Sequence, residues 1–572
     1  MHQLPWRSPQ LRQGRRHTSA AACFVVWFAG CSYDSTKPDT VDAPSETTAT
    51  LHHAYTAAEV DSASSAEELV DVTAFDVIDD GSEHSESLVG LIEANPSATL
   101  YFPCGTYLLN HFAIANTIRL KGASRSCVTL RQADDNQTSF ITATGNGIGL
   151  TDIAVAAAPD TVNGINYTGT SDYALNRITV GGAKTNGVKM SAASNVRVKD
   201  SRFAGNGHDQ FIYNLALGAT ANGIHIENSE FDATGVAAPF VSLYIGTSPG
   251  SPGSLSDIFI TNNRIIARNR GASECDGLVL ANGGGADGMS NIVITGNTIL
   301  NDTASGSASY GIELASTTNN VVSGNIIVNF QKGILLEYAA GAPFPQSPVG
   351  TVSGNIIRPN ANAPNGGSGI YVLQGNWTLA GNMVTAPGYN NGYGIALFGK
   401  HNVVTGNSVY STTGVGINIA ADDTVVSNNI ILGPAAGAAQ GIKLSSDPRK
   451  NVEIRNNHIS NVRYGIYALS TTFTKVIVAG NSFSGVGHQF WGNTSSPELF
   501  ISDDSSAKTL SLSGNLQLKA VPVSGLGVCT AATEGTRWGV IDANAPSYGE
   551  ALVGGGTVHL GAYCNGTSWI AH

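Results

Sequence analysis

Charged residues are scarce in this chain, at 13% of 572 residues, and the 30 Lys and Arg residues never cluster past the first residues. A nucleic-acid-binding surface needs such a cluster, so nucleic acid is not an expected partner. Almost no window shows the 3.6-residue or heptad spacing of a long helix, which excludes a coiled-coil architecture. With a net charge of −12, the body has no general attraction for anionic polymers, so any basic groups that matter must be local.

Cysteine is sparse as well, at seven residues, and no two of them form a C-x-x-C pair. A zinc or redox centre built on thiolates is therefore not expected. Cys104 with Cys127 and Cys529 with Cys564 lie near each other in sequence, which predicts two local disulfides, as suits an exported protein. Cys275 is left over, and we interpret it as a small buried hydrophobe rather than a nucleophile.

Residues 1–30 have the layout of an export signal, while no other run approaches the ~18 apolar residues of a membrane span. Several arginines precede an apolar stretch from Ala20 to Ala29, within the roughly 7–15 residues of a signal-peptide core. The sequence F-A-G-C ending at Cys31 resembles the lipobox of bacterial lipoproteins, in which the cysteine becomes the lipidated first residue. Phe28 stands where that motif has Leu, so an ordinary signal peptide cut elsewhere is the alternative.

Residues 32–62 are rich in Thr, Ser, Asp, Pro and Ala without periodicity, which predicts a flexible tether. Together with a signal segment at 1–31, the tether suits a body that works at a membrane surface. We expect a lipoprotein of the bacterial outer membrane or cell surface, attached through its lipid only, or otherwise a secreted protein.

A short phrase recurs from Asn228 to Asn481: an apolar residue, any residue, a small residue and Asn, followed by an apolar pair. Its Asn residues recur at steps of 22 to 35 residues. A second phrase, Gly-apolar-x-apolar, runs between these from Gly187 to Gly465. Each unit therefore holds short strands of period 2 that cannot bury their own apolar face, so neighbouring units must stack. The repeat predicts an all-β fold, a β-solenoid of about ten or more turns.

The recurring Asn is expected at a corner, because Asn and Gly tolerate the left-handed backbone conformation that β-branched residues refuse. Stacked at the ~4.8 Å strand spacing, these side chains can hydrogen-bond along the solenoid as a ladder.

The segment before the repeat has an acidic-Gly turn ending at Gly81, an amphipathic run with Leu88, Leu91 and Ile92, and the sequence T-L-Y-F-P-C-G-T-Y-L from Thr99. This order resembles the N-terminal start of the pectate-lyase-like right-handed parallel β-helix superfamily, which includes phage tailspikes and polygalacturonase-like enzymes. The resemblance implies a helix that caps the open end of the solenoid. We place the cap and first turns at 63–130, the β-helix at 131–515 and a C-terminal module at 516–572.

The last 44 residues, from Cys529 to His572, are compact in pattern, with a G-G-G turn at Gly554. They resemble a small β module found at the C-termini of phage tail proteins and other surface β proteins. The resemblance implies capping, oligomerisation or adhesion rather than catalysis.

Chemistry is expected on the third residue of the Gly-apolar-x-apolar phrase, which faces outward and forms a row across successive turns. Cleavage of an acidic polysaccharide by β-elimination needs a cation for the uronate carboxylate, a base for the C5 proton and an acid for the leaving oxygen. Lys189, His208 and Tyr213 supply one of each, with Arg202 on the strand between them. The alternative for each of these residues is a purely structural role, either as a solvated side chain or as a side chain that covers the face of the sheet.

Further residues of the expected groove come from the same turns and the next ones. Asp209 is expected to orient His208 or to hold a calcium ion, the one cofactor that the sequence suggests. At the following strand the pattern does not decide between Leu243 and Tyr244 as the outward residue. The substrate-binding candidates, for which a salt-bridge role is the alternative, are Asp209, Tyr244, Arg268, Arg270, Glu274 and Asp276.

These observations favour an exported β-helix protein that acts on a uronate-containing polysaccharide by β-elimination or C5 epimerisation, two reactions that need the same residues. The alternative from another class is a noncatalytic carbohydrate-binding, adhesin-like or tailspike-like surface protein, which the polar surface and the C-terminal module favour. A glycoside hydrolase comes third, because its paired carboxylates are not evident. No N-T-D motif occurs, and Asp422-Asp423 lies many turns from Gly207-His208.

Overall fold

The computed structural model describes residues 69–502 and 520–572 apart from short gaps. The gaps are residues 135, 192, 235–239, 248–252, 269–275, 284–287, 303–308, 339–348, 361–366, 386–391, 411–413, 435–438, 446–447, 470–471 and 493–498. The expected signal segment and tether lie outside the described residues, as do Cys31, Arg270, Glu274 and Cys275.

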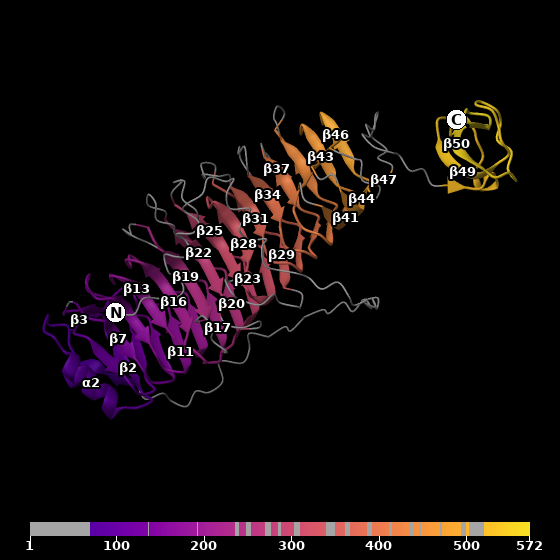
Figure 1. Cartoon of the computed structure of the whole chain (residues 1–572). Helices are drawn as coiled ribbons and strands as arrows, with labels where there is room; N and C mark the ends of the chain where they lie inside the picture. Colours follow the sequence, from indigo (N-terminus) through magenta and orange to yellow (C-terminus); the bar gives the residue numbers. More distant parts are fainter. Residues whose placement is uncertain are drawn as a thin grey trace.

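The chain winds through three parallel sheets, A, B and C, whose strands it visits in that order in every turn (Figure 1). Sheet A consists of β1 (Leu69–Asp71), β2 (Thr99–Phe102), β5 (Arg119–Gly122), β8 (Ile148–Thr151), β11 (Ser171–Asn176), β14 (Ser194–Lys199), β17 (Ala221–Glu227), β20 (Leu255–Thr261), β23 (Met289–Thr295), β26 (Thr318–Ser323), β29 (Gly350–Ser353), β32 (Trp377–Ala380), β35 (Val403–Thr405), β38 (Thr424–Ser427), β41 (Arg449–Arg455), β44 (Phe473–Ala479) and β47 (Leu499–Ser502). Sheet B consists of β3 (Gly105–Leu109), β6 (Val128–Gln132), β9 (Ala154–Ala156), β12 (Thr179–Gly181), β15 (Arg202–Ala204), β18 (Glu230–Asp232), β21 (Arg264–Ala267), β24 (Thr298–Asn301), β27 (Ile326–Val328), β30 (Ile356–Arg358), β33 (Met383–Thr385), β36 (Ser408–Tyr410), β39 (Ile430–Leu432), β42 (His458–Ser460) and β45 (Ser482–Ser484). Sheet C consists of β4 (Phe112–Ile114), β7 (Ser139–Ala143), β10 (Asn163–Tyr167), β13 (Asn186–Met190), β16 (Asp209–Leu215), β19 (Val241–Thr247), β22 (Asp276–Ala281), β25 (Tyr310–Ala315), β28 (Lys332–Glu337), β31 (Ser368–Val372), β34 (Tyr393–Leu397), β37 (Val415–Ile419), β40 (Gln440–Leu444), β43 (Tyr464–Ala468) and β46 (His488–Gly492).

Sheets B and C hold 15 strands each, so the described part of the chain forms 15 complete turns. This arrangement is a right-handed parallel β-helix, which confirms the fold predicted from the repeat. Inward side chains alternate with outward ones along each strand, as in Leu278 and Leu280 of β22, which are fully buried. The inward residues of all three sheets merge into one long apolar core.

Glycine recurs in sheet C because sheet B packs closely against it there. A Cβ added to Gly416 would lie 2.5 Å from the Ile431 side chain and 2.6 Å from the Gly441 carbonyl oxygen of the next turn. No real Cβ tolerates such contacts, so the repeated Gly-apolar phrase reflects a steric limit and also marks the register of each sheet C strand.

The corner from sheet A to sheet B is held by a ladder of nine buried asparagines. From Asn263 to Asn457, the backbone N–H and the Nδ2 of each donate to the Oδ1 of the next, at 2.9–3.1 Å. Each Nδ2 also donates to a backbone carbonyl of the preceding turn, as Asn407 does to Leu379. The ladder residues are Asn263, Asn297, Asn325, Asn355, Asn382, Asn407, Asn429, Asn457 and Asn481.

The left-handed conformation at this corner belongs to the residue before the ladder asparagine. Gly406 has φ +64° and Asn428 has φ 55°. In the first unit of the repeat, Asn228 is this left-handed residue with φ 50°, and Ser229 takes the ladder position, where its N–H donates to Asn263 Oδ1 at 2.9 Å. The expected ladder is therefore confirmed, but the left-handed turn and the ladder are tasks of two neighbouring residues.

Both ends of the described chain carry smaller elements. Near the N-terminus, η2 (Val72–Phe75) precedes α2 (Ser85–Ala94), which buries Leu88, Leu91 and Ile92 against the core as expected for a cap. After the solenoid, β48 (Ala520–Val521), β49 (Arg537–Ala543), β50 (Val558–Cys564) and β51 (Trp569–Ala571) form a separate four-stranded sheet, and η3 (Val523–Gly525) lies between β48 and β49. None of the described helices is both long and apolar enough to cross a membrane.

Both disulfide pairs expected from the sequence are joined in the structure. Cys104 and Cys127 link two consecutive turns at the capped end, with Cα atoms 4.9 Å apart. Cys529 and Cys564 close the C-terminal sheet, with Cα atoms 5.5 Å apart.

Replacing Asn407 by Ala should destabilise the solenoid, because the two donors of Asn382 would lose their buried acceptor. We expect a loss of about 1–3 kcal/mol in the free energy of unfolding, the cost of leaving buried polar groups unsatisfied. Urea unfolding followed by circular dichroism measures it. Ser408→Ala, at the half-exposed next residue, is the matched control, and equal stability of the two variants would contradict the role of the ladder.

Candidate functional site

The connections between strands vary in length along the two edges of sheet C. From β8 to β45, every connection from sheet A to sheet B is two residues long, such as residues 296–297. Connections on either side of sheet C are longer, reaching residues 359–367 between β30 and β31 and residues 338–349 between β28 and β29. Since long connections carry function on a rigid scaffold, the outer face of sheet C is the candidate site.

The strand register defines one row of outward residues on this face, hereafter the outer row. In chain order it reads Ala113, Thr142, Asn166, Lys189, Ile212, Tyr244, Val279, Glu313, Leu335, Tyr371, Ala396, Asn418, Lys443, Tyr467 and Trp491. The row predicted from the sequence matches this one except at β16, and Tyr244 rather than Leu243 faces outward.

The placement of Tyr213 in the outer row is wrong, because Ile212 pairs with Lys189 and Tyr244 there. Tyr213 points into the core, fully buried, and its hydroxyl donates to the carbonyl of Ala193 at 2.9 Å. Burial raises the pKa of this phenol well above its usual value. A side chain so enclosed has no access to a substrate.

His208 and Asp209 form a pair at the start of β16. His208 Nδ1 lies 3.0 Å from Asp209 Oδ2, and the other carboxylate oxygen accepts the Val241 N–H at 2.9 Å. Asp209 is buried, whereas the His208 side chain is 34% exposed with its ring 4.9 Å from that of Phe240. Asp209 therefore orients His208, which is one of the two roles expected for it.

A calcium site at Asp209 does not fit this geometry, because both carboxylate oxygens already accept hydrogen bonds or face His208. Across residues 69–502 and 520–572, gaps apart, no group of three or more His, Cys, Asp or Glu side chains is placed to share a metal ion.

Lys189 and Arg202 do not join His208. The His208 N–H bonds the carbonyl of Thr185 on the neighbouring turn, and Lys189 lies four residues further along that turn, roughly 13 Å at the rise of an extended strand. Arg202 belongs to β15 of sheet B, so its side chain leaves a different face of the solenoid. The four predicted catalytic residues are thus not one constellation.

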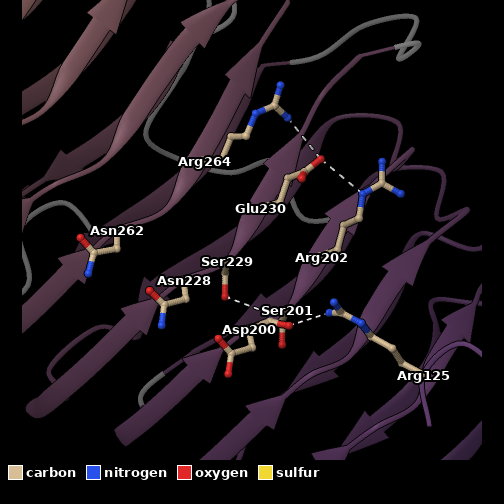
Figure 2. Close-up of a pocket in the computed structure, with 9 residues that line it drawn as sticks. All are labelled: Arg125, Asp200, Ser201, Arg202, Asn228, Ser229, Glu230, Asn262 and Arg264. Atoms are coloured by element: carbon tan, nitrogen blue, oxygen red, sulfur yellow. Dashed lines mark hydrogen bonds and ion pairs between the residues drawn. The ribbon is translucent and has the colours of Figure 1, made fainter.

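Arg202 instead lines a shallow polar pocket of about 230 Å³ at the corner between sheets A and B (Figure 2). Its guanidinium lies 3.3 Å from Glu230 and 3.3 Å from Asp232, and Glu230 also lies 3.4 Å from Arg264. Arg125 donates to the carbonyl of Asp200 at 2.6 Å. The arginines of this pocket are therefore engaged within the protein.

Three adjoining positions of the outer row, on β16, β19 and β22, are closed by apolar packing. Ile212, Tyr244 and Val279 are buried although they face outward, because they form a second cluster outside the core with Val241 and Phe240. This cluster occupies the region where the sequence predicted an open substrate site.

The two remaining substrate-binding candidates that the structure describes, Asp276 and Arg268, have structural roles. Asp276 is fully buried, and its Oδ1 accepts the N–H of Tyr310 at 2.9 Å. Arg268 lies 3.6 Å from Asp302 in an ion pair, which is the alternative that the sequence left open.

The rear half carries two groups of aromatic side chains. In the first, hereafter the central cluster, Lys332 Nζ lies 4.2 Å from the ring centre of Tyr371 and 5.0 Å from that of Tyr310. The Phe398 ring lies 5.0 Å from that of Tyr371. An ammonium above aromatic faces is held by the ring quadrupole, which fixes both partners.

The second group, hereafter the terminal cluster, lies on β43 and β46 and consists of Tyr464, Tyr467, His488 and Trp491. The Tyr464 ring lies 5.1 Å from those of Tyr467 and Trp491 and 5.6 Å from that of His488. Tyr467 and Trp491 are 5.2 Å apart with their planes within 30°. The guanidinium of Arg463 lies 5.0 Å from the ring centre of Tyr464.

Between the clusters, Asn418 and Lys443 take the outer row, and the Ser445 hydroxyl donates to Asn418 Oδ1 at 3.2 Å. Partial burial lowers the pKa of Lys443 below its ordinary value. None of the site residues predicted from the sequence lies in this half. The missed signal was the recurrence of Tyr or Trp at outward positions of β31, β43 and β46.

Comparisons with known proteins found one matching family and several similar solved structures. A family described as "Right handed beta helix region" matches residues 346–483, and no curated protein matches the chain. Among solved structures, the Dettilon tailspike protein is 15% identical over 65% of this chain and 68% of that chain, with a TM-score of 0.42. A family 28 exopolygalacturonase of Yersinia enterocolitica is 12% identical over 78% and 79%, with a TM-score of 0.33.

A further similar structure is the A-module of the mannuronan C-5 epimerase AlgE4 of Azotobacter vinelandii. It is 14% identical over 76% of this chain and 100% of that chain, with a TM-score of 0.27. The matched family region at 346–483 lies within the three stacked parallel sheets, and the chain is a right-handed parallel β-helix protein.

Proposed function

We propose that the rear half of the outer face of sheet C, from β25 to β46, binds a polysaccharide. The observation that carries this is the gathering of half-exposed aromatic rings at the central and terminal clusters. Sugar rings present apolar C–H faces that pack on aromatic side chains, while Tyr and Trp keep a polar edge for hydroxyl groups. The outer row runs along the solenoid with one residue every ~4.8 Å, which suits an extended polymer.

An acidic, uronate-containing polymer suits the charges on this face. Lys332, Lys443 and Arg463 place cations beside the aromatic rings. The chain as a whole carries a net charge of −12, so these groups are the local basic residues that attraction to a polyanion requires. On the described strands of sheet C in this half, the acidic residues are Glu313 on β25 and Glu337 on β28.

Noncatalytic binding, as in an adhesin or a tailspike-like protein, is the function that the geometry supports best. The elimination set of Lys189, His208, Tyr213 and Arg202 is dispersed between the core and two outer faces. Hydrolysis has less support still, because Asp422 lies 3.4 Å from Lys400 and Asp423 bonds Asn451 at 2.7 Å, so both serve a corner of the solenoid.

β-Elimination or C5 epimerisation is a second candidate function, favoured by the His208–Asp209 pair. A half-exposed imidazole held by a buried carboxylate has the arrangement of a general base. The partly buried ring of Phe240, 4.9 Å from the imidazole, offers an apolar contact for a sugar ring beside it.

We also propose that the chain is exported and anchored through a lipid on Cys31. The two disulfides suit an oxidising compartment, and the F-A-G-C sequence suits lipidation.

Tyr371→Ala should weaken binding of an acidic polysaccharide about tenfold, equivalent to about 1.4 kcal/mol, because the ring supplies contact area that Ala lacks. Isothermal titration against alginate, polygalacturonate and a neutral glucan measures this. Tyr410→Ala, which removes an outward tyrosine of sheet B, is the matched control. Equal affinities of the two variants, or no binding by the wild-type protein, would count against the proposal.

His208→Gln should abolish any elimination or epimerisation, since the amide cannot take the C5 proton. Absorbance of unsaturated products reports elimination, and NMR of the C5 configuration reports epimerisation. His225→Gln, at a histidine stacked on Phe259 in sheet A, is the control and should keep activity. A wild-type protein that yields neither product on these polymers removes the second candidate.

Cys31→Ser should release the protein from the membrane fraction of a bacterial host, because a serine cannot carry the thioether-linked lipid. Metabolic labelling with a fatty-acid analogue checks lipidation directly. Identical fractionation of the variant and the wild-type protein, with no label on either, would rule out the anchor.

A further inference from the structure

The central and terminal clusters lie on one straight line of the solenoid. Tyr371 and Tyr467 both belong to the outer row and are separated by four strand steps, through Ala396, Asn418 and Lys443. At the ~4.8 Å spacing of stacked strands the separation is roughly 19 Å, and Trp491 lies one step further, at roughly 24 Å. One extended ligand lying along the row therefore meets both clusters in turn.

The positions between the clusters add few contacts of their own. Ala396 and Asn418 face outward but are buried, and the Asn418 amide oxygen already accepts from Ser445, so a ligand would cross the side chains that cover them. Lys443 is the only charged residue among the three, and its half-buried side chain lies beside Tyr467 in the register. The row thus has two aromatic contact points, with Lys443 as the accessible outer-row residue between them.

The two clusters repeat the same chemistry. Each pairs aromatic rings with a cation, Lys332 at 4.2 Å from the Tyr371 ring centre and Arg463 at 5.0 Å from that of Tyr464. A polymer with a repeated apolar face and a repeated acidic group would satisfy both at once. The terminal cluster is also accessible, since Trp491 is 43% exposed.

We infer that the central and terminal clusters are two linked subsites for one polysaccharide chain, so that the protein selects long acidic chains over short ones. This inference rests on the proposed binding function of the same face. After one subsite is filled, the second binds the same chain at a high effective concentration, and the rigid solenoid fixes the distance between them. Chain length then becomes a recognition feature without a deep pocket.

The test compares uronate oligosaccharides of defined length, prepared from alginate and polygalacturonate, some too short and some long enough to span both clusters. Isothermal titration is run on the full folded chain, on Tyr371→Ala, on Trp491→Ala and on the double variant, with Tyr410→Ala as control. We expect long chains to bind the wild-type protein roughly 100-fold more tightly than short ones. Either single variant should lose most of this gain, and the double variant should lose binding at both lengths.

Arg463→Gln is a milder variant that keeps every ring of the terminal cluster and should reduce the affinity for long chains alone. The inference is overturned if short and long chains bind with equal affinity, or if the length effect is unchanged in Trp491→Ala and Arg463→Gln. In either case, weaker polysaccharide binding by Tyr371→Ala would still support the proposed function. If Trp491→Ala only lowers the melting temperature, the terminal cluster is a structural end of sheet C and the inference is wrong. If the wild-type protein binds no uronate chain of any length, both the inference and the proposed function are wrong.

Discussion

A buried amide that finds no partner is costly, and the solenoid is arranged around nine that all find one. At the corner between sheets A and B, each ladder asparagine from Asn297 to Asn457 accepts two hydrogen bonds on Oδ1, and its Nδ2 donates to a neighbouring amide and to a backbone carbonyl. The hydrogen-bond ladder is continuous only if each of its turns brings one asparagine to the same place. A one-residue insertion at any corner within the ladder would leave buried donors without acceptors, which explains why every connection there has two residues from β20 to β45.

Fixing one corner in this way directs variation to the other two. Extra residues occur where sheet C begins and ends, and the outward residue of sheet C differs from turn to turn. The glycine column supports this division, because the side of sheet C that packs on sheet B has no room for a Cβ at Gly416. The outer row is therefore the part of each turn that is free to acquire a function, and in the last six turns it carries Tyr371, Tyr467 and Trp491.

The architecture could be predicted from the sequence because each of its rules is local. Asn and Gly recur in fixed phrases, strands alternate with period 2, and Leu88, Leu91 and Ile92 share one helix face. The site could be predicted only where a local marker set the register. At β16, Gln210 stands where other strands have Gly, and without that marker Tyr213 was assigned outward in place of Ile212. The prediction for Arg202 was wrong for another reason. Consecutive strands of a turn belong to different sheets, so nearness in sequence does not bring their side chains together. The stacking of Tyr467 on Trp491 joins residues 24 positions apart and follows only from the observed pairing of turns.

An extended ligand makes different demands from a small one. A small molecule needs an enclosed pocket to gather enough contacts, whereas a polymer can collect modest contacts along a surface if the surface does not have to be ordered first. A β-helix meets that condition, because its backbone is paired on both sides of every inner strand and its outer row keeps a constant spacing. Aromatic rings then add contact area at little entropic cost, since Tyr and Trp have few rotatable bonds and here lock one another by stacking. Under these constraints the shallow face of sheet C, and not the polar pocket between sheets A and B, is the surface on which binding energy can accumulate.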